Sequence, residues 1–420
     1  MSPAVSPGAT RAPAASYTPD GMSRTVPDDR RTTTHRITSI DIIRGAVMVL
    51  MAIDHVRVFS GIPAGGPTPG VFFTRWITHF CAPAFIFLAG TAAFLYGEKV
   101  RDRGTLARFL LTRGVWLVLL ELTVLRFGWT FNFDYAHYVL AGVIWVIGWC
   151  MILMSALVYL PVVVVGTVGA AIIALHNITD FFPLARAASQ SRLAWLWQLL
   201  YFGGSISLGN GEDGPQLAVL YSIIPWIGVM AAGFGFGRVM QMDADRRRRV
   251  CLSLGIAAIV AFLILRGFNL YGDPRPWGVA PAPAPALLQF LGTTKYPASL
   301  LFLLMTLGPT MLAIPLLERA RGPIANVLTV FGRVPFFYYV LHIPLIHLIF
   351  VVLSIARFGS VIPWMTANHP MFNPPAPPGY TYSLTALYAI TVLAVTILYF
   401  PCRWFADLKA RRTDRWLSYL

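Results

Sequence analysis

Charged side chains are scarce in this sequence. Asp, Glu, Lys and Arg together make up 12% of its 420 residues, whereas hydrophobic residues make up 56%. A soluble globular domain carries roughly a quarter charged residues. The composition therefore excludes an ordinary soluble domain and indicates an integral membrane protein.

Cysteine is also rare, and its four copies have neither the spacing of metal ligands nor the pattern of a disulfide framework. All four fall in apolar stretches, where a thiol ordinarily acts as a small packing side chain. No carboxylate–histidine pattern of the ligand type is present. We therefore expect no metal site, and we expect no nucleic acid partner.

Apolar periodicity is missing at the N-terminus. Residues 1–36 are rich in Pro, Ala, Ser, Thr and Arg, and such a segment cannot bury enough surface to order itself. We expect it to be a disordered cytoplasmic tail. Residues 37–407 are then the transmembrane domain, and residues 408–420 are a basic cytoplasmic tail.

Long apolar runs are what the sequence does contain. Several approach the roughly 20 residues that cross a bilayer, so the predicted fold is all-α, a polytopic integral membrane helical bundle. Residues 193–203 are predicted to form an interfacial helix because their Trp and Tyr suit the headgroup level. The sequence predicts about ten transmembrane helices, at residues 40–59, 74–97, 107–126, 138–160, 161–176, 217–240, 250–268, 299–317, 325–356 and 384–405.

The basic residues are unevenly distributed between the loops. Most of the 33 Lys and Arg residues fall in the N-terminal tail, in residues 98–113, 238–249 and 318–333, and near the C-terminus. The other loops are longer and rich in Pro, Gly and aromatic residues. By the positive-inside rule both termini are cytoplasmic, provided that the number of spans is even.

The first predicted span carries an unusual number of ionisable groups. Asp41, Arg44, Met48, Met51 and His55 follow three- and four-residue steps, so they share one face of a helix. Arg44 and His55 are about 16 Å apart along the helix axis. Ionisable groups in a span are costly and are a functional hypothesis by default. We therefore predict that this face lines a functional site.

Two other spans carry polar residues at matching depths. The second span has Arg75 and His79 near its outer end, and the ninth has Arg333 on its inner side with Tyr338 and His342 one turn apart. With the first span, these helices bring three histidines into the outer half of the bundle. Together they predict a polar cavity there.

Structural explanations remain open for the same residues. Asp41 and Arg44 are three residues apart and equally suit an interfacial ion pair. His55 could be a hydrogen-bonded packing histidine. Asp54 lies about 100° around the helix from His55, so it does not obviously orient that ring. It could instead pair with Arg57 or with the second span.

Three stretches resemble transmembrane acyltransferases, in particular the catalytic domain of heparan-alpha-glucosaminide N-acetyltransferase and its bacterial relatives. "SIDIIRGAVMVLMAIDH" is similar to their first-span signature of Asp-x-x-Arg-Gly and an apolar run. "APAFIFLAG" is similar to the second-span pattern, and "FGRVPFFYYVLHIPLI" resembles a late span of the O-acetylating membrane acyltransferases. The resemblance touches most of residues 37–97 and 325–347.

The resemblance implies an acyltransferase, in first place an acetyltransferase, that uses cytoplasmic acetyl-CoA or another acyl-CoA as donor and an extracytoplasmic sugar or glycan as acceptor. The lysosomal enzymes carry their catalytic histidine before the second span, where "GIPAGGPTPG" has none, so His55 or His79 must take that role. The implied catalytic residues are His55, His79 and Asp54. The implied donor-binding residues are Arg44, Asp41, Arg75, Arg333, His342 and Tyr338.

The resemblance also implies a multi-pass protein of a bacterial plasma (inner) membrane that contacts lipid. The sequence leaves the oligomeric state open, with a homodimer as one option. A multi-span transporter or permease is the main alternative, because such proteins also carry intramembrane charges. A third alternative is a membrane scaffold in which polar side chains only hold helices together.

Overall fold

The computed structural model of the chain describes residues 37–66, 68–181, 190–209, 214–279, 285–372, 374–412, 414 and 417. The predicted N-terminal tail lies outside these ranges, and so do residues 418–420 of the predicted basic tail. The division of the chain into two tails and a transmembrane domain stays a prediction.

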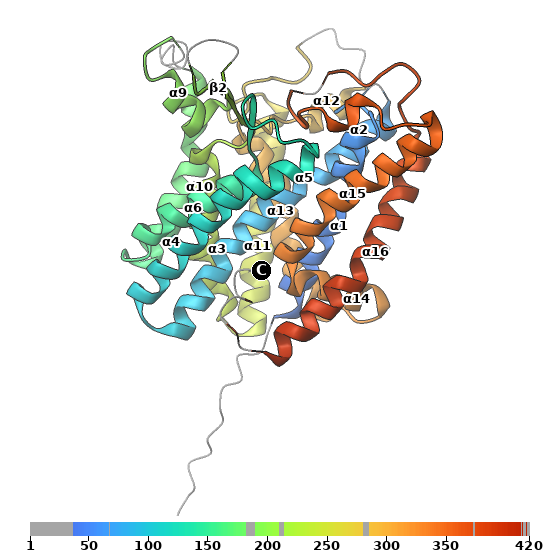
Figure 1. Ribbon diagram of the computed structural model, residues 1–420. Helices are drawn as coiled ribbons and strands as arrows, with labels where there is room; N and C mark the ends of the chain where they lie inside the picture. The colour runs from blue at the N-terminus through green and yellow to red at the C-terminus, as the bar shows by residue number, and fades with distance from the viewer. Residues whose placement is uncertain are drawn as a thin grey trace, which may run out of the picture. The chain divides into compact units, whose positions relative to one another are not determined.

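The described residues confirm the all-α class (Figure 1). The longer helices are α1 (Thr38–Phe59), α3 (Cys81–Val100), α4 (Arg103–Leu120), α6 (Val143–Leu157), α7 (Val162–Leu175), α10 (Ile223–Met240), α11 (Ala244–Gly267), α13 (Leu300–Leu317), α14 (Pro323–Arg333), α15 (Pro335–Phe358) and α16 (Leu384–Arg411). Shorter helices and turns are α2 (Pro69–Trp76), η1 (Ile77–Phe80), η2 (Glu121–Leu125), α5 (Arg126–Thr130), η3 (His176–Phe181), α9 (Ala194–Trp197), η4 (Gln198–Phe202), α12 (Ala286–Leu291) and η5 (Pro363–Thr366).

The helices have the length and composition of a polytopic membrane protein. Within the described ranges, seven helical segments are long and apolar enough to cross a membrane: Pro69–Val100, Val162–Asp180, Ile223–Met240, Ala244–Gly267, Leu300–Leu317, Pro335–Phe358 and Leu384–Arg411. The chain is therefore an integral membrane protein.

The remaining three predicted spans are also largely helical but differ from the seven. α1 carries four charged residues, α4 carries three arginines before the π turn η2, and α6 has only 15 residues after a short strand. The prediction of about ten spans thus counts α1, α4 and α6 with the seven, and the number that cross the membrane stays a prediction.

The predicted span at 325–356 is wrong as a single helix. The structure breaks it at Val334, whose φ of −132° and ψ of 48° are not helical, and α14 and α15 lie on either side of the break. The cause is Pro335, because proline disfavours the helical conformation of the residue before it.

The helices approach one another closely at glycines. A methyl group on Gly45 of α1 would lie 1.9 Å from the carbonyl oxygen of Leu328, and one on Gly332 would lie 1.8 Å from that of Asp41. Only glycine allows this contact between α1 and α14, as is common where membrane helices cross at small residues. Gly45 belongs to the Asp-x-x-Arg-Gly motif and Gly332 to "FGR", so the two motifs form one helix crossing.

A small sheet at one end of the bundle was not predicted. Strands β1 (Tyr138–Ala141), β2 (Gly204–Ser207) and β3 (Gln216–Val219) form the order β1-β3-β2, with β1 parallel and β2 antiparallel to β3. Strands of four residues give too little alternation to be read from sequence. Residues 193–203 are helical as predicted, in α9 and η4.

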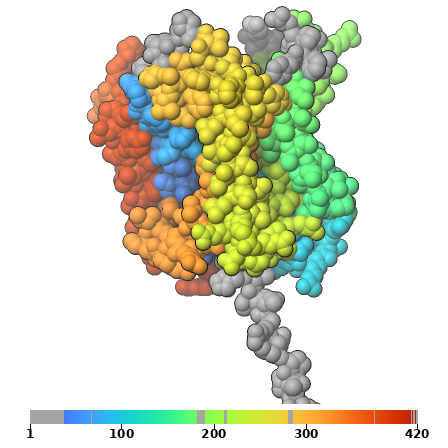
Figure 2. Space-filling view, turned by 180° about the vertical axis from the view of Figure 1, so that it is seen from behind, coloured from blue at the N-terminus to red at the C-terminus, as the bar shows by residue number. Residues whose placement is uncertain are grey.

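The two ends of the bundle differ. β2, α2 and α12 lie at one end (Figure 1). At the other end Gln241 donates a hydrogen bond to Glu98 (3.1 Å), and Arg247 forms an ion pair with Glu318 (2.6 Å), which brings the basic turns of the chain together. On the opposite face, blue segments of the N-terminal region are visible in a hollow bordered by α16, α14 and α11 (Figure 2).

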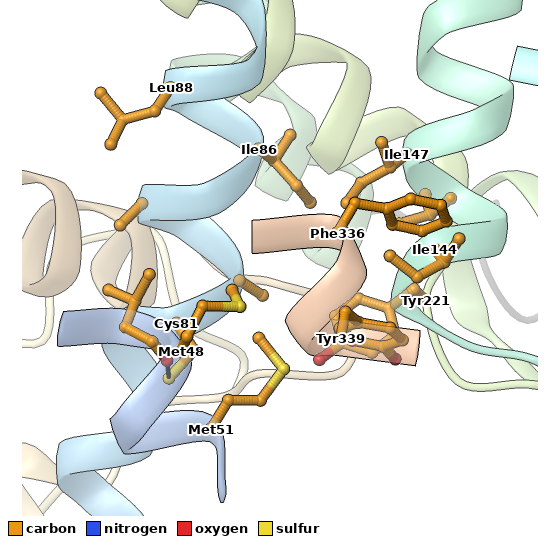
Figure 3. Close-up of a cluster of buried hydrophobic side chains, with 14 of the residues drawn as sticks. Met48, Met51, Cys81, Ile86, Leu88, Ile144, Ile147, Tyr221, Phe336 and Tyr339 are labelled. Atoms are coloured by element: carbon orange, nitrogen blue, oxygen red, sulfur yellow. Dashed lines mark hydrogen bonds between the residues drawn. The ribbon is translucent and has the colours of Figure 1, made fainter. Parts of the chain in front are cut away.

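The core between α1, α3, α6 and α15 is apolar (Figure 3). Met48 and Met51 of α1 pack there with Cys81, Ile144 and Tyr339, all no more than 7% exposed. Between membrane helices such side chains stabilise the bundle through van der Waals packing, because lipid is as apolar as the core itself. This core fills the space between the level of Arg44 and the level of His55.

Candidate functional site

Two histidines from distant parts of the chain meet inside the bundle. Nδ1 of His55, near the end of α1, lies 2.7 Å from Nε2 of His342 on α15, and the two rings stack with their centroids 4.8 Å apart. The edge of His55 also packs against Trp129 of α5. His342 is fully buried and His55 is half-buried.

The hydrogen bonds define the protonation of the neutral pair. Nδ1 of His342 lies 2.6 Å from the carbonyl oxygen of Tyr339. A carbonyl only accepts, so Nδ1 of His342 carries hydrogen and its Nε2 is the acceptor. Nδ1 of His55 must then donate to His342, which leaves Nε2 of His55 with a free lone pair. His55 is thus prepared to accept a proton.

His55 lines a large cavity at the end of the bundle that carries the sheet. The cavity has a volume of about 690 Å³, which is within the usual range for a small-molecule site. Its wall includes Asp54, Glu121, Trp129, Tyr296 and Trp364 as well as backbone from the loops after α1 and before α16. The predicted polar cavity in this half of the bundle is therefore present.

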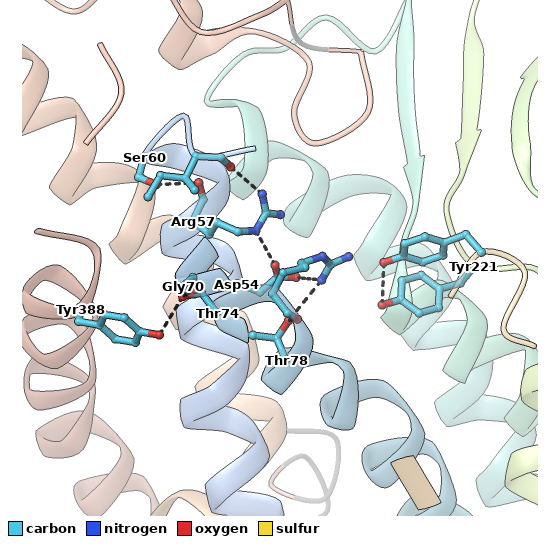
Figure 4. Close-up of polar contacts among 11 residues, drawn as sticks. Asp54, Arg57, Ser60, Gly70, Thr74, Thr78, Tyr221 and Tyr388 are labelled. Atoms are coloured by element: carbon cyan, nitrogen blue, oxygen red, sulfur yellow. Dashed lines mark hydrogen bonds and ion pairs between the residues drawn. The ribbon is translucent and has the colours of Figure 1, made fainter. Parts of the chain in front are cut away.

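Asp54 connects the first two predicted spans (Figure 4). One carboxylate oxygen accepts from Arg57 (3.0 Å), and the other forms an ion pair with Arg75 of α2 (2.8 Å). Both partners foreseen for Asp54, Arg57 and the second span, are thus engaged. Arg75 also donates to Thr78. Because these charges are largely buried, removing one would leave the others uncompensated.

The other predicted catalytic histidine lies beside this cavity and not in its wall. His79 lines a second cavity of about 700 Å³, which shares Arg75 and Tyr296 with the first. Its ring packs edge-on against Phe302, and its Nδ1 has no hydrogen-bond partner among the described residues. The structure thus places His55 and Asp54 in the wall of one cavity, with His342 buried against His55 and with His79 lining the neighbouring cavity.

The predicted donor-binding residues separate into groups. Arg44 donates to the carbonyl oxygen of Leu88 (2.9 Å), and the close crossing of α1 and α14 brings it to the same end as Asp41 and the exposed Arg333. None of these three lines either large cavity. Tyr338 is fully buried and stacks on His342, with its hydroxyl unpartnered among the described residues.

Two charged residues at the site were not singled out in the sequence. Glu121, in the π turn after α4, is fully buried and accepts from the backbone N–H of Ile144 with Oε2 (3.1 Å), while Oε1 has no partner within the described residues. It is the only acidic residue in the predicted span 107–126, and that signal could have identified it. Lys295 gave no comparable signal, because it lies in a loop.

Lys295 lies against two tyrosine rings. Its ammonium nitrogen is 5.2 Å from the ring centroid of Tyr296 and 6.0 Å from that of Tyr221, within the range of a cation–π contact. Burial raises the pKa of Tyr296, but the charges of Lys295 and Arg75 outweigh this effect and lower it below the usual value. This part of the site is therefore electropositive.

Residues 36–269 match the family described as heparan-alpha-glucosaminide N-acetyltransferase, catalytic, and this is more than half of the chain. The chain belongs to this family. A comparison with curated proteins gives no match. This membership, together with the apolar helices, places the chain in a family of transmembrane acetyltransferases. The transporter and scaffold alternatives gain no support from it.

The family match covers only part of the site. His55, Asp54, Arg75, His79 and Glu121 lie within it, and so do the first- and second-span motifs. Lys295, Arg333, Tyr338 and His342 lie beyond residue 269. Across the described part of the chain, no group of three or more His, Cys, Asp or Glu residues could hold a metal ion.

Proposed function

We propose that this chain transfers an acetyl group from cytoplasmic acetyl-CoA to a carbohydrate on the opposite side of the membrane, with His55 as general base. The observation that carries the proposal is the relay from the Tyr339 carbonyl through His342 to His55, which leaves Nε2 of His55 unprotonated at a cavity of about 690 Å³. A base held in this way contributes about 10²- to 10⁴-fold to the rate.

The reaction needs one proton acceptor that later acts as a donor. The oxygen or nitrogen of the acceptor attacks the thioester carbon while Nε2 of His55 takes the proton from that atom. The tetrahedral intermediate then collapses, the carbon–sulfur bond breaks, and its electron pair leaves on sulfur. His55 returns the proton to sulfur, so the products are the acetylated carbohydrate and free CoA, and His55 is regenerated.

His342 and Asp54 act on the position of these groups. His342 holds the ring of His55 in the productive tautomer. Asp54 holds Arg57 at the end of α1 and Arg75 on α2, and thereby fixes one wall of the cavity. The ring of Tyr338 stacks on the ring of His342. His79 serves the neighbouring cavity, whose wall it shares with Arg75 and Tyr296.

The donor has charges at one end and its thioester at the other. We assign its phosphates to the basic end of the bundle, to which the contact of Gly332 with the backbone of Asp41 brings both Arg44 and Arg333. The planar guanidinium suits phosphate. The pantetheine arm must then pass the level of Met48 and Met51. Methionine side chains are flexible enough to give way to a narrow apolar chain.

The acceptor occupies the large cavity. Aromatic rings of Trp129, Trp364 and Tyr296 offer flat apolar faces, and Glu121 contributes a polar residue to the same wall. The name of the family refers to a glucosaminide. We extend from this only the class of acceptor, an extracytoplasmic sugar or glycan. The basic turns at the other end support an orientation in which that end faces the cytoplasm, and we propose a bacterial plasma membrane as the location.

Mass spectrometry of cell-envelope glycans tests the proposal. Cells with the gene, cells without it and cells with His55→Gln at equal protein level are compared. We expect acetylated glycans only with the unaltered protein. Identical acetylation in all three strains would refute the function, whereas equal acetylation with the unaltered protein and His55→Gln would refute the role of His55 alone.

A further inference from the structure

The electropositive side of the site contains a cation without a counter-ion. Lys295 is 8% exposed, and among the described residues it has no hydrogen bond and no ion pair, only the rings of Tyr221 and Tyr296. A buried charge is costly unless it is paired. An ammonium held in this way therefore suits a negative charge that a bound molecule supplies.

The carboxylate of Asp54 does not fill this role. Asp54 lines the same small cavity as Lys295, but its two oxygens already accept from Arg57 and Arg75. Three cations thus share one carboxylate, which leaves an excess of positive charge, and Lys295 is the one of the three that forms no ion pair among the described residues.

Lys295 and His55 face one another across a small space. Both line a cavity of about 40 Å³ whose other walls include Met51, Cys81 and Val143. Such a space has room for only a few water molecules. Its size suits a small group such as an acetyl carbonyl, and its apolar walls strengthen any electrostatic contact inside.

The loop that carries Lys295 is firmly held. Asp273 accepts hydrogen bonds from the backbone N–H of Thr294 (2.7 Å), from its hydroxyl (2.8 Å) and from the hydroxyl of Ser299 (2.9 Å). Asn177 accepts from the backbone N–H of Leu300 (2.7 Å). The position of Lys295 is thus set before any ligand binds, and a donor held in advance loses little free energy in reorganisation.

We infer that Lys295 is a catalytic residue that stabilises the oxyanion of the tetrahedral intermediate. This inference rests on the proposed function. As the acceptor attacks, the π electrons of the thioester carbonyl move to its oxygen, and the ammonium of Lys295 donates a hydrogen bond to that oxygen. When the carbon–sulfur bond breaks, the carbonyl re-forms and the charge disappears. Lys295 keeps its protons throughout, and the proton transfers stay with His55.

Kinetics of purified Lys295→Met and Lys295→Arg test the inference, with acetyl-CoA as donor and envelope glycans from cells without the gene as acceptor. Loss of one oxyanion donor costs about 10²- to 10³-fold in kcat. We expect this loss in Lys295→Met with little change in either KM, and partial recovery in Lys295→Arg. Lys99→Met, which alters an exposed lysine at the end of α3, is the matched control and should retain full activity.

The outcomes separate this inference from the proposed function. If the unaltered protein transfers acetyl groups and Lys295→Met does so at the same kcat, the inference is refuted and the function stands. A loss confined to the KM of the acceptor would also refute it, because Lys295 would then bind an anionic acceptor. If Lys295→Met does not fold, Lys295→Ala with added methylammonium decides: recovery of kcat supports the oxyanion role, and no recovery contradicts it.

Discussion

Nδ1 of His55 lies 2.7 Å from Nε2 of His342, although 287 positions separate the two residues in the sequence. The contact joins a helix within the family match to a helix beyond it. Because Tyr339 fixes the hydrogen on the far side of His342, the free lone pair is on the His55 nitrogen that faces away from His342. The proposed base and the residue that orients it thus come from distant parts of the chain.

The role of His342 in orienting His55 can be tested with a matched pair of variants. His342→Gln keeps an atom that accepts from Nδ1 of His55, whereas His342→Leu does not. We expect kcat for acetyl transfer to fall by about 10-fold in the first and by about 10²-fold or more in the second, since the productive tautomer is lost. Equal activity of the two variants would show that His342 only fills space.

Asp54→Asn should destabilise the protein. It removes the only negative charge between Arg57 and Arg75, whose side chains are 9% and 13% exposed. Breaking such a pair lowers the free energy of unfolding by about 3 kcal/mol. Denaturation in detergent measures this. Asp414→Asn, which breaks an exposed 3.9 Å contact with Arg412, is the control and should cost almost nothing. Equal stabilities would show that the buried pair is not needed.

Gly45→Ala tests the crossing of α1 and α14. The added methyl would lie 1.9 Å from the carbonyl oxygen of Leu328, so the helices must separate, and we expect a loss of about 3 kcal/mol in the free energy of unfolding. Gly267→Ala, at the end of α11, meets nothing within 4 Å and should be neutral or stabilising. A Gly45→Ala protein with unchanged melting temperature would mean that this contact is not close.

The stability of the protein should depend on pH through His369, which lies in the loop beside the cavity. Burial lowers the pKa of His369 to about 4, although its hydrogen bond to the Trp364 carbonyl opposes this. The unfolded value is about 6.5, so the folded state resists protonation. The neutral His369 therefore makes a stabilising contribution that is fully present above pH 6.5 and is lost as pH falls toward 4. By pH 5 the free energy of unfolding has fallen by about 2 kcal/mol.

His369→Gln removes this dependence. Melting temperatures of the unaltered protein and the variant, measured from pH 8 to pH 5, should run parallel above pH 7 and converge below it. Curves that stay parallel over the whole range would show that His369 does not titrate on unfolding in this window.

The sequence predicted the polar face of α1 but not the residue that it meets. Three- and four-residue steps place Arg44 and His55 on one helix face, because helix geometry is local. The contact of His55 with His342 depends on the break at Pro335, which sets the direction of α15 after α14. That direction depends on how the helices pack, and no local pattern records it.

The two missed charges have different reasons. Glu121 is an acidic residue within an apolar predicted span, so it could have been identified from the sequence. Lys295 could not, since its position depends on Asp273, which is 22 residues away in another part of the same long loop region. The strands were missed because each has only four residues.

Transfer of label across a sealed membrane tests the central claim most directly. Proteoliposomes that hold ¹³C-acetyl-CoA inside, with the basic end of the protein facing inward, are mixed with envelope glycans from cells without the gene. We predict labelled external glycan with the unaltered protein and a loss of about 10²-fold or more with folded His55→Gln. No label with the unaltered protein, or equal label with both proteins, would contradict the account.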